Sequence, residues 1–141
     1  MKRLAVIGLG AIGSLVGGYL ARGGEDVTLI SAFQRDQAAH LSRTGLRITG
    51  NGDDFHVPVR AVYLEDLAPE EQFDLVFLDP PYGDALLASC LAAVEPHIAD
   101  GGLVVCESDE GQALPETVGA LQADRTYRYG RVHITLYRRK V

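Results

Sequence analysis

Six residues near the amino terminus have the spacing of a loop that binds phosphate groups. They follow a short apolar segment, open a segment of helical periodicity, and read Gly8, Leu9, Gly10, Ala11, Ile12 and Gly13. In this context Gly8 permits a tight turn, Gly10 lets a pyrophosphate approach the backbone, and Gly13 allows close helix packing. Free amides and the helix dipole then attract the phosphates. We expect these six residues to bind a dinucleotide; the alternative is a glycine turn that serves packing alone.

The end of the next apolar segment indicates which nucleotide is preferred. NAD sites usually place an acidic residue there to bind the ribose hydroxyls, but this chain has Ser31, with Gln34 and Arg35 just after it. An arginine forms charge-assisted hydrogen bonds with a 2′-phosphate. The sequence therefore predicts an NADP site that includes Ser31 and Arg35. The alternative is that Arg35 is a solvated helix residue.

A second motif, Asp79-Pro80-Pro81-Tyr82, follows the apolar residues 73–78. The exocyclic amine of a nucleobase is a poor nucleophile because its lone pair is delocalised into the ring. In amino-methyltransferases, a carboxylate and a proline carbonyl accept the N–H groups of this amine and orient it toward the methyl group of S-adenosylmethionine, while an aromatic ring stacks on the extruded base. On this hypothesis Asp79, Pro80 and Tyr82 are catalytic. The alternative is a Pro-Pro turn with a helix-capping aspartate.

Alternating strands and helices are needed to position both motifs at one edge of a sheet. Apolar runs predict parallel strands at residues 3–7, 26–30, 59–63, 73–78 and 102–107. Helical segments lie between most of them, and Pro115 is expected to open a further short helix. Two hairpins are predicted, at residues 46–57 and 126–138. The fold class is therefore α/β, a Rossmann-like three-layer αβα sandwich with a mostly parallel sheet in the order 3-2-1-4-5-7-6 and a terminal antiparallel hairpin.

Bulk properties limit the possible functions. A chain of 141 residues is the size of one domain. Its amino terminus has neither the length nor the flanks of a signal peptide or membrane span, so we expect a cytoplasmic protein without a membrane partner. Cys90 and Cys106 lie in apolar runs and are expected to be buried thiols without a disulfide. The four histidines lack ligand spacing, so no metal site is expected.

Charge is unevenly distributed along the chain. Between residues 65 and 116 every charged side chain other than histidine is acidic, whereas residues 124–141 carry six basic residues and one acid. Nucleic-acid binding draws much of its affinity from cations placed against phosphates, so the acidic middle argues against a nucleic-acid partner. The basic tail is either a solvated edge hairpin or a contact for RNA. A small-molecule nucleotide is the expected partner, and the oligomeric state is left open.

The first half of the chain resembles a known family. The resemblance spans residues 1–68 and rests on the glycine loop together with the segments Asp26-Val27-Thr28-Leu29, Gly45-Leu46-Arg47-Ile48 and Val57-Pro58-Val59-Arg60-Ala61. These segments look like the NADP-binding half of ketopantoate reductases. That family places its catalytic lysine beyond this region, in and around a helical C-terminal domain. The resemblance therefore implies NADP binding but not ketopantoate reduction.

The second half resembles a different family. Residues 73–141 are similar to the C-terminal half of bacterial 16S rRNA guanine-N2 methyltransferases, on the segments 73–83, 101–107 and 129–138. That family's S-adenosylmethionine loop and its ribose-binding acid belong to an N-terminal half that this chain does not share. Ser31 occupies the place of that acid.

Three hypotheses follow from two halves that meet near residues 64–73. The first is a recombined, engineered chimera that holds NADP(H) at the glycine loop without efficient catalysis, with Asp79 weakening the binding by repelling phosphates. The second is an S-adenosylmethionine-dependent nucleic-acid amino-methyltransferase that uses Asp79 and Tyr82. The third is a scaffold that binds neither cofactor.

Overall fold

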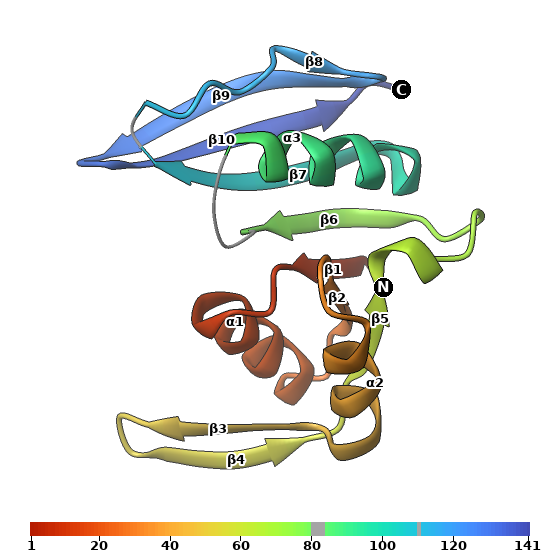
Figure 1. Cartoon of the computed structure of the whole chain (residues 1–141), viewed down its shortest axis with the longest axis vertical. Helices are drawn as coiled ribbons and strands as arrows, with labels where there is room; N and C mark the ends of the chain where they lie inside the picture. The colour runs from red at the N-terminus through yellow and green to blue at the C-terminus, as the bar shows by residue number, and fades with distance from the viewer. Residues whose placement is uncertain (80–83, 110) are drawn as a thin grey trace.

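The computed structural model describes residues 1–79, 84–109 and 111–141, and its strands and helices alternate as the sequence predicts (Figure 1). The elements are β1 (Arg3–Ile7), α1 (Ala11–Arg22), β2 (Asp26–Ser31), α2 (Arg35–Thr44), β3 (Leu46–Gly50), β4 (Asp53–Val57), β5 (Arg60–Tyr63), the 3-10 turn η1 (Leu64–Asp66), β6 (Phe73–Leu78), α3 (Asp84–Val94), the 3-10 turn η2 (Glu95–His97), β7 (Ile98–Asp109), β8 (Thr117–Val118), β9 (Leu121–Tyr129) and β10 (Val132–Arg139).

Eight of the strands form one sheet in the order β5-β2-β1-β6-β7-β10-β9-β8. The predicted order 3-2-1-4-5-7-6 is confirmed, with β8 added at the edge. The first five strands in this order, β5, β2, β1, β6 and β7, are parallel to one another. The last three, β10, β9 and β8, are added through antiparallel pairs. The predicted hairpin of β3 and β4 forms a separate two-stranded sheet. The two halves of the chain meet at the centre of the large sheet, where β1 pairs with β6 and Val6 lies opposite Phe77.

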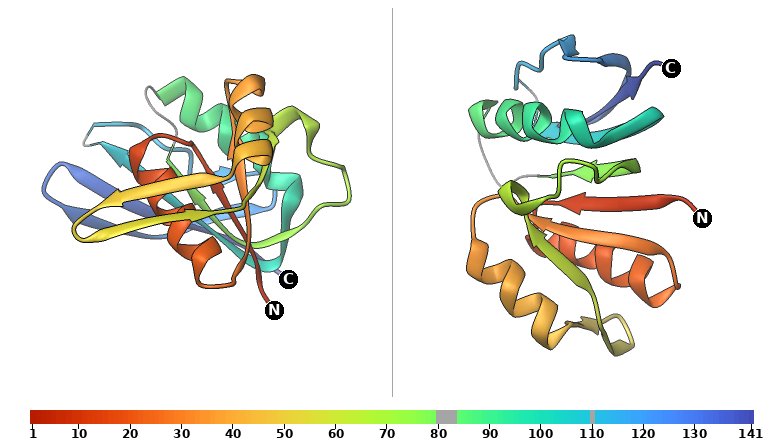
Figure 2. Two further views of the ribbon diagram at one scale, coloured as in Figure 1. Left: turned by 90° about the horizontal axis from the view of Figure 1, so that it is seen from below. Right: turned by 90° about the vertical axis from the view of Figure 1, so that its right-hand side faces the viewer.

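Helices lie on both faces of this sheet, as predicted. Successive side chains of a strand point to opposite faces, and Ile7 and Val6 accordingly belong to different buried clusters. The cluster of Ile7 includes Leu87, Leu91 and other residues of α3. The cluster of Val6 includes Ala38 of α2 and is contacted by partly buried residues of α1. In the right view of Figure 2, α1 and α3 stand on opposite sides of the strands.

The fully buried residues of α1 are glycines, while Val16 and Leu20 are partly buried against the core. The buried glycines are Gly13, Gly17 and Gly18. A Cβ at Gly17 would lie 3.0 Å from Leu29, so the helix approaches β2 too closely for a larger side chain. Three other large residues of the helix point to solvent, since Ile12, Leu15 and Tyr19 are 52%, 43% and 40% exposed.

The prediction of a short helix that begins at Pro115 is wrong. Residues 117–118 form the edge strand β8, which pairs with β9. The hydroxyl of the buried Tyr137 donates a hydrogen bond of 2.6 Å to the carbonyl oxygen of Pro115. A buried hydroxyl needs such an acceptor, and this long-range contact, together with pairing to β9, outweighs the local preference of proline for a helix start.

Cys90 and Cys106 are buried free thiols, as predicted. Burial raises the pKa of Cys90 to about 11 and that of Cys106 to about 12, so both stay protonated at neutral pH. Within the described ranges of the chain, no helix is both long enough and apolar enough to cross a membrane.

Candidate functional site

Hydrogen bonds to the ends of β2 and β6, the two strands that flank β1, hold the start of the glycine loop. Gly8 has a φ of 99°, a conformation that favours glycine. Its N–H donates to the carbonyl oxygen of Ile30 on β2 at 3.2 Å, and the carbonyl oxygen of Ile7 accepts from the N–H of Asp79 at 2.9 Å. These two bonds fix the point where the chain leaves β1 and turns into α1.

Gly10 and Gly13 differ in what surrounds them. A Cβ at Gly13 would lie 1.8 Å from the carbonyl oxygen of Gly8, whereas a Cβ at Gly10 would meet nothing within 4 Å. Gly13 therefore serves the contact between helix and loop, and Gly10 borders open space. The N–H of Ser14 donates to Gly10 at 3.0 Å, so the helix amides before Ser14 form the free amino-terminal end of α1. The first turn of α1 contains no acidic residue that would oppose an anion.

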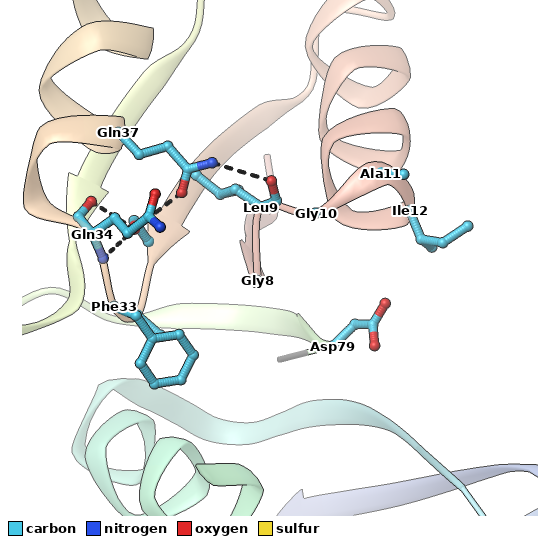
Figure 3. Close-up of a pocket in the computed structure, with 11 residues that line it drawn as sticks. Gly8, Leu9, Gly10, Ala11, Ile12, Phe33, Gln34, Gln37 and Asp79 are labelled. Atoms are coloured by element: carbon cyan, nitrogen blue, oxygen red, sulfur yellow. Dashed lines mark hydrogen bonds between the residues drawn. The ribbon is translucent and has the colours of Figure 1, made fainter. Parts of the chain in front are cut away.

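A pocket of about 370 Å³ opens over this loop (Figure 3). This volume lies within the range of about 300–1,000 Å³ of small-molecule sites. The lining residues come from the glycine loop, the end of β2, the start of α2 and the end of β6. They are Gly8, Leu9, Gly10, Ala11, Ile12, Ser31, Ala32, Phe33, Gln34, Gln37 and Asp79. The structure thus brings five of the six loop residues together with Ser31 and Asp79, while Gly13 packs behind them.

Ser31 lines the pocket, but its hydroxyl bonds within the protein. The side chain is buried, donates to the carbonyl oxygen of Gln34 at 2.8 Å and accepts from the N–H of the same residue at 3.2 Å. It therefore orders the turn between β2 and α2. The amide nitrogen of Gln37 donates to the carbonyl oxygen of Leu9 at 3.3 Å and so ties α2 to the glycine loop. Sequence reasoning missed Gln37 and Phe33, although their position just after the second strand was an available signal.

Arg35 lies outside the lining of this pocket. Its guanidinium is 2.6 Å from the carboxylate of Asp66 and 4.7 Å from the ring centroid of Tyr63. These residues line a second hollow of about 200 Å³ on the other side of α2's first turn, together with Ala38 and Ala61. Arg35 is thus paired with a carboxylate and does not line the first pocket.

Asp79 brings a negative charge to the rim of the pocket. The residue is half-buried, and its pKa is raised by loss of hydration and by the charge of Asp109. The pKa of Glu107 is raised by loss of hydration and by Asp79 and Asp109. The ends of β6 and β7 are therefore acidic. The other two residues of the predicted catalytic set, Pro80 and Tyr82, lie outside the described residues.

Metal chemistry has no support in the part of the chain that the structure describes. It contains no group of three His, Cys, Asp or Glu side chains arranged to hold an ion.

Comparisons with known proteins find relatives of two kinds. The chain is 43% identical over 76 residues to a 2-dehydropantoate 2-reductase of Pyrococcus abyssi, a match that covers 54% of this chain and 23% of the relative. It is 34% identical over 73 residues to the Bacillus subtilis protein named "Putative rRNA methyltransferase YlbH", covering 50% of this chain and 40% of that protein. The chain thus spans less than half the length of these curated relatives.

Solved structures of a dehydrogenase and of a methyltransferase have a similar fold. D-mandelate dehydrogenase, solved with NADH and anilino(oxo)acetate, matches 74% of this chain and 32% of its own, with a TM-score of 0.65 and 26% identity. A TehB-like SAM-dependent methyltransferase of Corynebacterium glutamicum matches 99% of this chain and 80% of its own, with a TM-score of 0.63 and 17% identity. The second likeness shows the fold alone.

The chain therefore has a Rossmann-like fold and a mixed ketopantoate-reductase and methyltransferase-like character. The profile of the family described as "Ketopantoate reductase PanE/ApbA" matches residues 4–127, which extends well past the half of the chain that carries the glycine loop. On this match, the chain belongs to the ketopantoate reductase family.

Proposed function

We propose that this chain is a nucleotide-binding domain that holds NADP(H) at the glycine loop without efficient catalysis. The observation that carries the proposal is the open pocket over Gly10, lined by the free amino-terminal end of α1. Backbone amides and the helix dipole favour a pyrophosphate at this position. Membership in the ketopantoate reductase family supports a nicotinamide nucleotide as the ligand.

The residues present fit such a ligand in part. The backbone around Gly10 leaves room for a phosphate, and Gln34 and Gln37 offer amide groups to polar atoms of a ribose. The end of β2 carries the buried Ser31 and no acidic residue that would favour NAD over NADP. Asp79 opposes the phosphates, so we expect weak binding.

We do not propose that this chain catalyses the reduction of ketopantoate. The match to the Pyrococcus relative covers 23% of that protein. The origin of the chain as a recombination of two Rossmann halves remains our hypothesis and rests on the two kinds of relatives.

A second candidate function is transfer of a methyl group from S-adenosylmethionine to a nucleic-acid amine. Asp79 favours it, because this carboxylate lies at the carboxyl end of β6 and lines the pocket. Against it stands Ser31, which offers the ribose of the methyl donor no carboxylate and whose hydroxyl already bonds to Gln34. We therefore rank this function second.

One set of calorimetric titrations of the whole chain distinguishes these functions. NADPH is expected to bind saturably and more tightly than NADH, and S-adenosylmethionine is expected not to bind. The Gly10→Ala variant should fold normally, because a Cβ there meets nothing, and should lose at least about tenfold in affinity, ~1.4 kcal/mol, because the methyl group fills phosphate space.

The matched control is Gly23→Ala at the other end of α1, where a Cβ would make ordinary contacts of 3.4 and 3.5 Å. Its affinity for NADPH should equal that of the wild type. Saturable binding of S-adenosylmethionine alone would reverse the ranking of the two functions, and binding of neither cofactor would leave the scaffold hypothesis.

A further inference from the structure

The two faces of β7 at the centre of the large sheet are buried to different degrees, and the more deeply buried face packs with α3. In β7 the side chains on the α3 side, Val104, Cys106 and Ser108, are buried. The alternate side chains Leu103 and Val105 point to the opposite face and are half-buried. Because a strand shows its residues to the two faces in turn, this alternation shows that one side of β7 is covered more closely than the other.

The same pattern extends to the neighbouring strands. Register places Phe77 of β6 beside Val105, and Val105 beside Leu136 of β10. In the ranges that the structure describes, no helix lies over β7 and β10 on this side, since α1 packs on β1 and β2 (Figure 2, right). The half-buried apolar residues of this open face are Leu75, Phe77, Leu103, Val105, Val132, Ile134 and Leu136.

Charged residues of opposite sign lie at opposite corners of the open face. One corner is acidic and consists of Asp79, Glu107 and Asp109 at the ends of β6 and β7. The other corner is basic, because register places Arg138 of β10 beside Leu103 and Arg125 of β9 beside Leu136. The apolar rows lie between the two corners.

The basic side chains are available for a partner. Arg138 is 3.7 Å from the exposed carboxylate of Asp124, and Arg125 donates to the hydroxyl of Tyr127 at 3.1 Å. Such exposed contacts contribute little to stability, so a partner can replace them.

We propose that a second copy of this chain packs on the open face. Contiguous apolar patches of this kind mark interaction sites on proteins, and two sheets pack well face to face. A two-fold axis lying in the interface would bring the acidic corner of each copy against the basic corner of the other, the self-complementarity that an isologous dimer requires. A nucleic acid fits less well, because the acidic corner repels phosphates.

Sedimentation velocity of the whole chain over a series of concentrations tests this proposal. The wild type is expected to dimerise reversibly. Ile134→Lys places a charge within the apolar rows, beside Glu107 in register, and should raise the dissociation constant at least about tenfold. The matched control is Leu86→Lys on α3, an exposed leucine outside the open face, which should leave the dissociation constant unchanged.

Charge reversal keeps the test independent of any folding defect caused by Ile134→Lys. The chain with Glu107→Arg and Asp109→Arg, and the chain with Arg125→Glu and Arg138→Glu, should each associate less with themselves than the wild type does. An equal mixture of the two should form a heterodimer. A wild-type monomer at every concentration would overturn the proposal. So would a dimer that is indifferent to Ile134→Lys and to the reversed charges, since it would use another surface.

Discussion

Asp79 connects the two resemblances of the chain, since it lies in the methyltransferase-like motif and also lines the pocket over the glycine loop. Its carboxylate is disfavoured by loss of hydration and by Asp109, which together raise its pKa. A bound phosphate adds a further negative charge and disfavours the ionised form more strongly. Binding of a nucleotide should therefore be linked to protonation of Asp79.

The sign of this linkage gives a prediction. The neutral form of Asp79 predominates below its raised pKa, so the affinity for NADH, whose pyrophosphate does not titrate near neutral pH, should increase as the pH falls through that pKa. Asp79→Asn should bind about fivefold more tightly than the wild type at neutral pH, a gain of ~1 kcal/mol for one removed charge repulsion. Calorimetry over a pH series checks this, and an equally steep pH dependence in the variant would refute the role of Asp79.

Arg35 shows why a residue's type and position do not fix its partner. The sequence places an arginine just after β2, where it suits a 2′-phosphate, but Asp66 is far away in the sequence and its approach was not predictable from local patterns. In the structure the two side chains are 2.6 Å apart and both are exposed. An exposed pair of this kind is worth about 1 kcal/mol or less, which a 2′-phosphate can outcompete.

We predict that Arg35→Glu abolishes the preference for NADPH over NADH. Asp66→Asn, which releases the guanidinium, should instead strengthen NADPH binding by a few fold and leave NADH binding unchanged. Parallel titrations of both variants with both nucleotides measure this. If the ratio of the two affinities stays the same in both variants, Arg35 is a surface residue without a part in nucleotide selection.

The elements that position the site were largely predictable, because strand order and the glycine loop follow from apolar runs and glycine spacing. What local patterns did not reveal depends on contacts distant in the sequence. Pro115 is held by the hydroxyl of Tyr137, and the inner face of α1 is set by how closely Gly17 approaches Leu29. The open face of β7 was also hidden, since Leu103 and Val105 are as apolar as the buried residues beside them.

Packing of α1 on β1 depends on the last glycine of the loop. Gly13→Ala should lower the free energy of unfolding by about 1–3 kcal/mol, because its Cβ would lie 1.8 Å from the carbonyl oxygen of Gly8 and the helix must shift. Chemical denaturation followed by circular dichroism measures the loss. The Gly10→Ala variant is the control, and equal stabilities of the two variants would contradict this division of roles.

The molecule as a whole has a core that both halves of the chain share. Residues Ala5, Ile7 and Ile30 from the first half lie in one buried cluster with Val76 and Leu78 from the second. Residues 64–73 therefore separate segments that resemble two different families, but they do not separate two structural units. Strands β1 and β6, from the two halves, pair directly in the sheet. At this junction the buried side chains of each half pack against those of the other half.

Such a shared core predicts a single cooperative unfolding transition. Thermal or urea unfolding should give coincident curves from far-ultraviolet circular dichroism and from tyrosine absorbance. Three of the tyrosines that contribute to this absorbance, Tyr127, Tyr129 and Tyr137, lie in β9 and β10. Two separate transitions would show that the halves fold independently and that the domain is not a single unit.

If the glycine loop binds the pyrophosphate of a nucleotide, an amide-resolved NMR titration with NADPH will report the contact at the loop itself. The amides of Gly10, Ala11 and Ile12 should show the largest saturable shifts, with smaller ones at Gln34 and Gln37 from the opposite side of the pocket. Saturation with the shifts confined to other parts of the sheet, or spectra that do not change at millimolar nucleotide, would show that the glycine loop is not a nucleotide site.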